Sequence, residues 1–122
     1  MSKPKLTSST IAELTQLAIA FRDERDWKQF HNPKDMALSL VLESAELMEL
    51  MQWKNGAELA EHLAKNKMKL AEELSDVLFW VLAIAHDNDV DLGDAFKQKL
   101  IANAKKYPVE KSRGVSTKYT EL

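Results

Sequence analysis

Two pairs of acidic residues, each set within an apolar helical stretch, constrain this chain more than any other feature of its sequence. The pairs are Glu43 with Glu46 and Glu73 with Asp76, and the two members of each pair are three residues apart. Residues at this spacing lie on the same face of an α-helix. Carboxylates within an apolar face are costly to bury unless a cation or strong hydrogen-bond donors compensate their charge. The sequence therefore predicts that two helices pack together and gather four carboxylates around one point.

Each acidic pair shares its helix face with large apolar side chains. The residues in line with the acids are Met36, Leu47 and Leu50 on one helix and Val77, Trp80 and Ile84 on the other. Other acidic doublets have a simpler explanation, since Glu58 and Glu61 point away from the neighbouring leucines. Hard divalent cations prefer oxygen ligands, and Mg²⁺ is the cation that such a cluster favours. Partly exposed structural acids are the alternative that the residues leave open.

Length and composition restrict the chain to a narrow class of proteins. Its 122 residues suffice for one domain, and a chain this short buries only about two-thirds of its unfolded surface, so subunit association would help to stabilise it. A net charge of −2 argues against a nucleic-acid polymer as partner. There is no cysteine, and hence no disulfide or thiolate zinc site. No signal peptide follows Met1–Lys5 and no apolar run could cross a membrane, so a cytoplasmic protein is expected.

Local capping signals predict where the first two long helices begin. Thr10 and Glu13 match a capping box at the start of a first helix. Asn32 followed by Pro33 matches an N-cap with a first-turn proline. The second helix that starts there is expected to run to about Trp53.

The remaining signals complete an all-α architecture. Gly56 is expected to end the second helix. Residues 57–65 favour a short amphipathic helix, Asn66 should cap a third long helix, and a fourth should start near Asp91 and end before Pro108. Strand signals are absent from the sequence. The fold class predicted is a compact helical bundle of four main helices plus a short connecting helix.

The C-terminal tail, residues 109–122, differs from the helical domain predicted over residues 1–108. It has little apolar periodicity, and composition favours a frayed, solvated terminus. This end of the chain is also basic, with Lys105, Lys106, Lys111, Arg113 and Lys118. Acids for a metal ion together with cations for phosphates make a nucleotide polyphosphate an attractive ligand. No glycine-rich phosphate loop is present.

Three tryptophans, Trp27, Trp53 and Trp80, each have two interpretations. Packing in a core is the common fate of an aromatic side chain, and Trp80 could be purely core. Trp27 and Trp53 are expected at helix ends, where a ring can line the mouth of a cleft and stack on a nucleotide base. Such stacking contributes ~1–3 kcal/mol per base and does not by itself select one base.

The pattern of Glu-x-x-Glu on one helix followed by Glu-x-x-Asp on another resembles that of the all-α nucleoside triphosphate pyrophosphohydrolases, the MazG-like superfamily. Longer segments resemble its dCTP pyrophosphatase branch. These segments are 25–27 (Arg-Asp-Trp), 29–31 (Gln-Phe-His), 43–46, 52–54 (Gln-Trp-Lys), 72–78 (Glu-Glu-Leu-Ser-Asp-Val-Leu), 107–108 (Tyr-Pro) and 118–122 (Lys-Tyr-Thr-Glu-Leu). The resemblance extends from about Ile11 to the C-terminus.

This resemblance implies hydrolysis between the α- and β-phosphates of a nucleoside triphosphate, which gives a monophosphate and pyrophosphate. The Mg²⁺ ligands that it implies are Glu43, Glu46, Glu73 and Asp76. The substrate contacts that it implies are Trp27 and Trp53 at the base, Trp80 at a position that is aromatic in relatives, and Asn103 with Lys106 or Tyr107. Some relatives carry a histidine near the base at the position of Ala18, so the preferred base stays open. Homodimers or homotetramers with sites built from more than one subunit are also implied.

The function predicted is Mg²⁺-dependent hydrolysis of a (deoxy)pyrimidine triphosphate such as dCTP. A carboxylate not fully used in ligation, with Glu46 as the first candidate, could orient or deprotonate the attacking water. The alternative is a non-catalytic helical module that binds a nucleotide or a partner protein. The methionines of the second helix, Met36, Met48 and Met51, favour this alternative because methionine suits adaptable surfaces.

Overall fold

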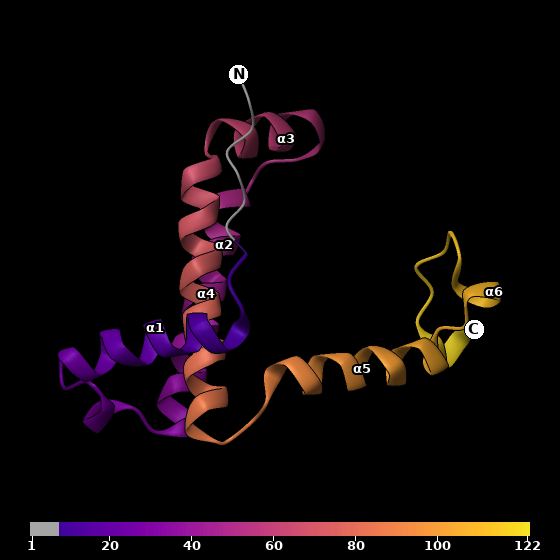
Figure 1. The fold of residues 1–122 in the computed structure, drawn as a ribbon. Coiled ribbons are helices and arrows are strands. Elements are labelled where there is room, and N and C mark those ends of the chain that lie inside the picture. Colours follow the sequence, from indigo (N-terminus) through magenta and orange to yellow (C-terminus); the bar gives the residue numbers. More distant parts are fainter. Residues whose placement is uncertain (1–7) are drawn as a thin grey trace. The chain divides into compact units, whose positions relative to one another are not determined.

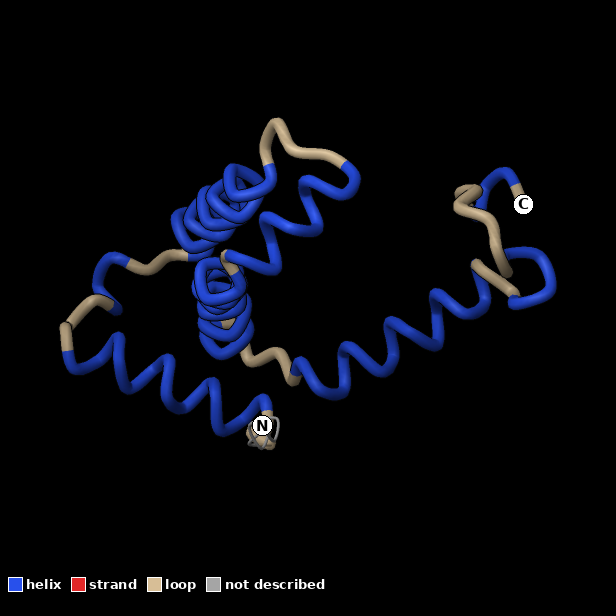
Figure 2. The backbone as a smooth tube through the Cα atoms, turned by 90° about the horizontal axis from the view of Figure 1, so that it is seen from above, coloured by secondary structure: helices blue, strands red, loops and turns tan. Residues whose placement is uncertain are grey.

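A computed structural model describes residues 8–122 of the chain, and these residues form helices joined by loops, without a strand (Figures 1 and 2). The elements are α1 (Ile11–Glu24), η1 (Lys28–Phe30), α2 (Pro33–Met51), α3 (Gly56–Lys65), α4 (Lys67–Asp87), α5 (Leu92–Lys106), α6 (Val109–Ser112) and η2 (Tyr119–Glu121), where η marks a 3-10 helix. The predicted all-α class is confirmed. The stretch Met1–Lys5, used for the signal-peptide prediction, lies outside the described residues.

The chain divides into two compact units, with the boundary between Asp89 and Val90. The first unit contains α1 to α4, and the second contains α5, α6 and η2. The four main helices of the prediction are α1, α2, α4 and α5, and α3 is its short connecting helix. The domain boundary predicted after residue 108 stays a prediction.

Helices α2 and α4 form the centre of the first unit, where they run side by side in opposite directions (Figure 1). Helix α3 joins them at one end, and α1 packs across the C-terminal half of α4. In the contact between α1 and α4, the rings of Phe21 and Phe79 pack edge to face with their centroids 6.1 Å apart. Because α2 and α4 carry one acidic doublet each, their pairing decides where the carboxylates meet.

Side-chain caps begin three of the helices, and the sequence predicts two of these caps, at Thr10 and Asn32, and a helix start near Asp91. The Thr10 hydroxyl accepts a hydrogen bond from the backbone N–H of Glu13 at 3.1 Å, and the Glu13 carboxylate accepts one from the N–H of Thr10 at 3.4 Å. Asn32 and Asp91 each accept a hydrogen bond from the backbone N–H three residues further on. A cap of this kind contributes ~1 kcal/mol, so these residues fix the starts of α1, α2 and α5 locally.

Two predictions about helix ends are wrong in detail. Helix α2 ends at Met51, and Gly56 is the first residue of α3 rather than the stop of α2. The chain turns instead around Trp53, whose φ of +70° lies in the left-handed region. Asn66 stands at the predicted start of the long helix, but its side-chain amide donates to the carbonyl of His62 at 2.8 Å. The side chain therefore caps a carbonyl at the C-terminal end of α3 and no N–H group at the start of α4.

A buried ion pair fastens α1 to the C-terminal end of α4. Arg22 is only 2% exposed, and its Nη1 donates to Oδ2 of Asp87 at 2.8 Å. Lys28 Nζ lies 3.3 Å from the same oxygen, and His86 Nδ1 lies 3.1 Å from Oδ1 of Asp87. Burial by itself raises the pKa of Asp87, but the hydrogen bonds from Arg22, His86 and Lys28 outweigh it and lower the pKa to about 2. The ionised carboxylate therefore stabilises the folded unit.

An Asp87→Asn variant should lose about 2 kcal/mol of unfolding free energy at pH 7, since one pKa unit corresponds to about 1.4 kcal/mol. The pKa falls from 3.8 to about 2 on folding, so this contribution is complete above about pH 5 and disappears as the pH drops from about 4 to about 2. Urea unfolding at fixed protein concentration measures both effects. The matched control is Asp23→Asn, because Asp23 lies 3.6 Å from Nε of Arg22 but is 60% exposed. Equal losses in the two variants would contradict the assignment.

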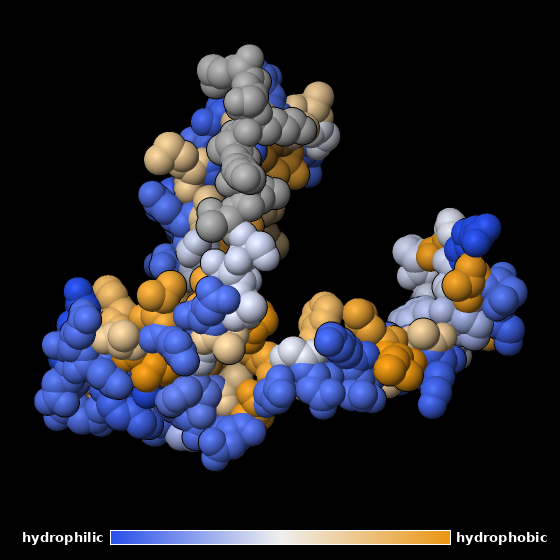
Figure 3. Space-filling model, in the orientation of Figure 1, coloured by the Kyte–Doolittle hydropathy of each residue, from blue (hydrophilic) through white to orange (hydrophobic). Residues whose placement is uncertain are grey.

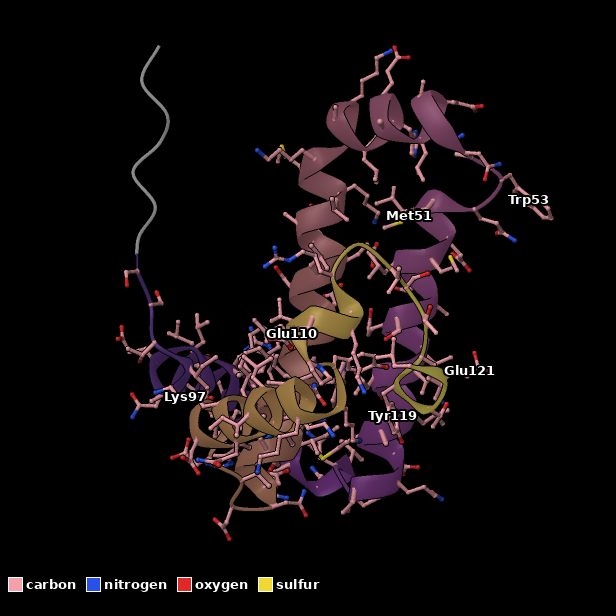
Figure 4. The ribbon with its side chains drawn as sticks, turned by 90° about the vertical axis from the view of Figure 1, so that its right-hand side faces the viewer. Met51, Trp53, Lys97, Glu110, Tyr119 and Glu121 are labelled. Carbon is pink, nitrogen blue, oxygen red and sulfur yellow. The ribbon has the colours of Figure 1, made fainter. Side chains whose placement is uncertain are left out.

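In the second unit the tail folds against the end of α5. The ring of Tyr119, labelled in Figure 4, lies 5.8 Å from that of Tyr107 in an edge-to-face arrangement. The ammonium of Lys106 lies 4.8 Å from the centre of the Tyr119 ring. The tail is exposed over nearly all of its residues, as composition predicts, but these contacts give it a defined conformation. They join residues too far apart in the sequence to appear as periodicity.

Few apolar side chains of the described residues are fully buried. Those that are buried are Ala18, Met36, Leu82, Ala83 and Ala85. Apolar residues that are more than half exposed include Leu38, Val41, Leu42 and Met48 on α2 and Phe96, Leu100 and Ile101 on α5. Figure 3 shows apolar surface along the α5 segment. Each unit thus leaves a large apolar surface uncovered. None of the described helices has the length and apolar character needed to span a membrane.

Candidate metal and nucleotide site

The two acidic doublets come together between α2 and α4. Glu43 and Glu46 lie in the middle of α2, and Glu73 and Asp76 lie in the first half of α4. One carboxylate oxygen from each of the four residues lies within 4.8 Å of those from the other three. Oxygens that surround one hard divalent cation spread over roughly 4–5 Å. The cluster therefore has the dimensions of a cation site.

The four carboxylates differ in their exposure to solvent. Glu73 is 5% exposed and Glu43 is half-buried, whereas Glu46 and Asp76 are exposed. The Oε2 atoms of Glu43 and Glu73 are both buried without a hydrogen-bond partner. Leaving a buried carboxylate oxygen without a donor is costly, and a bound cation would compensate both atoms. The side chains present fit a divalent cation.

The pKa of Glu43 also indicates that the cluster lacks a compensating positive charge. Burial raises the pKa of Glu43, and the neighbouring carboxyls of Glu46, Asp76 and Glu73 raise it further. A raised pKa means that the charged form is undercompensated in its surroundings. Lys69 supplies part of the missing charge, because its Nζ lies 2.9 Å from Oε1 of Glu73.

An apolar cavity of about 550 Å³ opens beside the acids. The residues that line it are Leu14, Leu17, Ala18, Phe21, Trp27, Glu43, Ser75, Asp76, Leu78, Phe79, Trp80 and Leu82. The ring of Trp27 lies 5.7 Å from that of Phe21, and the ring of Trp80 lies 5.2 Å from that of Phe79. Ligand clefts typically enclose about 300–1,000 Å³ with mainly apolar walls. This cavity therefore has the size and character of a small-molecule site, with two of the acids on its wall.

The structure brings two of the three tryptophans to this cavity. Trp27 and Trp80 line it, and so does Ala18. Trp53 is not among the lining residues. It is 87% exposed at the turn after α2 and projects away from the helices (Figure 4).

The other predicted substrate contacts lie in the second unit, at the C-terminal end of α5. The carbonyl of Asn103 accepts a hydrogen bond from the N–H of Tyr107 at 2.9 Å, which closes the helix. Lys106 and Tyr107 both contact the ring of Tyr119. Their role toward a substrate stays a prediction.

Sequence reasoning missed several residues of the site. Phe79 lines the cavity, and the ring of His31 lies 5.1 Å from that of Trp80. Burial lowers the pKa of His31, and the nearby charge of Arg22 lowers it further, so the imidazole is neutral at pH 7. Lys69 was detectable, because a lysine four residues before Glu73 shares its helix face.

Comparison with known proteins adds an independent finding. The family model described as MazG-like matches residues 38–122. The dCTP pyrophosphatase 1 of Rattus norvegicus is 44% identical over 115 residues, which cover 93% of this chain and 68% of the relative. The dCTP pyrophosphatase 1 of Homo sapiens is 42% identical with the same coverage. Among solved structures, a pyrophosphatase from Archaeoglobus fulgidus has a TM-score of 0.77 and 34% identity, covering 87% of this chain and 99% of its own.

These matches confirm the resemblance that the acidic pattern and the longer segments suggest. The family model covers more than half of the chain, and the relatives are similar over nearly all of it. The chain therefore belongs to the MazG-like family, in its dCTP pyrophosphatase branch.

Proposed function

We infer that this protein is a nucleoside triphosphate pyrophosphohydrolase of the dCTP pyrophosphatase type. The names of its relatives support the reaction. The structural observation that carries the inference is the cluster of four carboxylates, with two unpartnered buried oxygens, beside an apolar cavity. Water would split the anhydride between the α- and β-phosphates and release a monophosphate and pyrophosphate.

We propose Mg²⁺ as the cation and Glu43, Glu46, Glu73 and Asp76 as its ligands. The all-oxygen donor set supports this choice, because hard cations prefer carboxylates to nitrogen or sulfur. When bound there, the ion would neutralise charge on the triphosphate oxygens. The unpartnered oxygens of Glu43 and Glu73 also support a cation at this point.

Glu46 is the proposed general base. Its carboxylate is exposed, and it lines a second cavity of about 400 Å³ that is separate from the apolar one, so water can approach it. The carboxylate would orient a water molecule and accept its proton. The water oxygen would then bond to the α-phosphorus as the bond from that phosphorus to the bridging oxygen breaks. Positioning of this kind contributes much of the rate enhancement in phosphoryl transfer.

The apolar cavity is the proposed nucleoside site. Trp27 and Trp80 present aromatic surfaces there, and stacking on a base contributes ~1–3 kcal/mol. A pyrimidine preference, with dCTP as substrate, is proposed from the names of the relatives. Trp53 is proposed as a further base contact because its ring is free of packing, and Asn103, Lys106 and Tyr107 as further substrate contacts because they form a polar, basic group.

We also propose that the chain assembles into homodimers or homotetramers. Leu38, Val41, Leu42 and Met48 recur at helical spacing on α2 and are each more than half exposed. A second subunit that covers this face would enlarge a core that is small in one protomer. Sedimentation equilibrium tests the assembly, and a monomer at micromolar concentration would refute it. A cytoplasmic location is part of the proposal and is tested by cell fractionation.

Product analysis tests the proposed reaction. Incubation with dCTP and Mg²⁺ should yield dCMP and pyrophosphate, and chelation with EDTA should abolish turnover, because the carboxylates alone repel the triphosphate. Diphosphate plus orthophosphate would place the cleavage at a different bond. Unchanged dCTP that nevertheless binds would favour the non-catalytic module instead. Rates across the canonical and 5-substituted triphosphates, measured in the same assay, decide the preferred base.

A further inference from the structure

We propose that Lys69 is an internal counter-cation of the acidic cluster and that binding of the divalent cation displaces it. The proposal rests on the metal site proposed above. It assigns to Lys69 a positioning role: the lysine holds Glu73 when no metal is bound and sets how tightly the cluster takes up the ion.

The contact joins one immobile group to one mobile group. Nζ of Lys69 lies 2.9 Å from Oε1 of Glu73, and the side chain of Glu73 is 6% exposed while that of Lys69 is 56% exposed. The carboxylate is thus fixed in the interior, whereas the ammonium sits at the end of a flexible chain that reaches solvent. Lys69 also lines the second cavity together with Glu46, so it stands at an open approach to the cluster.

A second partner for the displaced ammonium is already in place. Oε2 of Glu72 lies 3.9 Å from the same Nζ, and the side chain of Glu72 is 64% exposed. Glu72 is not part of the cluster. Because residues three and four positions away flank the same side of a helix turn, Lys69 can move from Glu73 to Glu72 by side-chain rotation alone.

A divalent cation and an ammonium compete for this carboxylate. Both carry positive charge, and at contact distance in a partly buried site they repel each other strongly. The cation gains the four carboxylates and satisfies the unpartnered oxygen of Glu73, while the ammonium contacts that residue at one oxygen. Only molecules in which Lys69 has left Glu73 can bind the metal fully. The apparent affinity for metal is therefore lowered in proportion to the fraction of such molecules.

Calorimetric titration with Mg²⁺ in the absence of nucleotide tests the competition. Lys69→Gln should bind Mg²⁺ about three- to tenfold more tightly than wild type, the range expected for removal of one ion pair with a buried partner. Lys69→Arg, which keeps the ion pair, should stay near wild type. The matched control is Lys65→Gln, because Lys65 lies 2.8 Å from Glu61 in an exposed pair outside the cluster. This control should also bind Mg²⁺ as wild type does.

A second measurement separates displacement from simple charge repulsion. Acetylation of Lys69, followed by mass spectrometry, should accelerate when Mg²⁺ is added, while acetylation of Lys65 should not change. If wild type binds Mg²⁺ but Lys69 acetylation is unaffected, or if the Lys69→Gln and Lys65→Gln variants have equal affinities, the role of Lys69 is overturned alone. If wild type binds no Mg²⁺, the metal site itself is overturned, and the role of Lys69 with it.

Discussion

A Glu46→Gln variant should release pyrophosphate from dCTP at least about 100-fold more slowly than wild type, the loss typical of removing a general base or a charged metal ligand. The substitution removes the negative charge and the proton-accepting group but keeps the shape of the side chain. Because Glu46 is exposed, helix packing should be unaffected. The circular dichroism spectrum should therefore match that of wild type. Asp76→Asn should behave in the same way, since Asp76 is also an exposed member of the cluster.

The chain offers a matched control for this experiment. Glu58 and Glu61 on α3 have the same spacing as the two acidic doublets of the cluster, but they lie outside it. Glu58→Gln and Glu61→Gln should retain wild-type turnover. Full activity in Glu46→Gln or Asp76→Asn, measured by pyrophosphate release, would remove that residue from the mechanism.

A Glu43→Gln variant should uncouple the stability of the protein from divalent cations. At a hundredfold excess over its dissociation constant, Mg²⁺ should stabilise wild type by about 2.7 kcal/mol and the variant by far less. In the metal-free state the variant should be the more stable protein, by about 1 kcal/mol, because it removes a buried and poorly compensated charge. Chemical unfolding with Mg²⁺ and with EDTA measures both differences.

The pH dependence of stability tests whether the buried charge of Glu43 destabilises the metal-free protein. Its pKa is raised in the folded protein, first by burial and then by the neighbouring acids. A raised carboxyl pKa destabilises the folded state at neutral pH, and the penalty is relieved as the pH falls through the folded pKa. Metal-free wild type should thus gain stability on mild acidification, and Glu43→Gln should gain less. A metal-free variant that is less stable than wild type at pH 7 would contradict this account.

The sequence predicts those parts of the molecule that depend on residues within one or two helical turns. The caps at Thr10 and Asn32 form as predicted, and the fourth long helix starts at Asp91 as expected, because each start involves a side chain and a backbone group three residues away. The meeting of the acidic doublets is also foreseeable. Carboxylates on an otherwise apolar helix face are buried when that face packs. Burial is costly unless the carboxylates meet around a group that compensates their charge.

What the sequence could not give depends on contacts between distant segments. Helix α1 crosses the C-terminal half of α4 and so places Ala18 on the cavity wall. This crossing depends on packing between helices, which no local sequence pattern encodes. The fold of the tail depends on the contact between Tyr107 and Tyr119. The prediction that Gly56 ends α2 is wrong because a glycine after a helix is a common stop, whereas this chain turns three residues earlier.

That earlier turn has a consequence for Trp53. A left-handed backbone costs a residue with a Cβ atom about 1–2 kcal/mol, a penalty that glycine avoids. The indole stands in this conformation at 87% exposure. Glycine would therefore adopt this backbone conformation with less strain, and the large ring of Trp53 makes little contact within the protomer. This strain lowers the free energy of folding and is the same with and without a ligand, so a base that stacks on the indole would gain the full stacking energy.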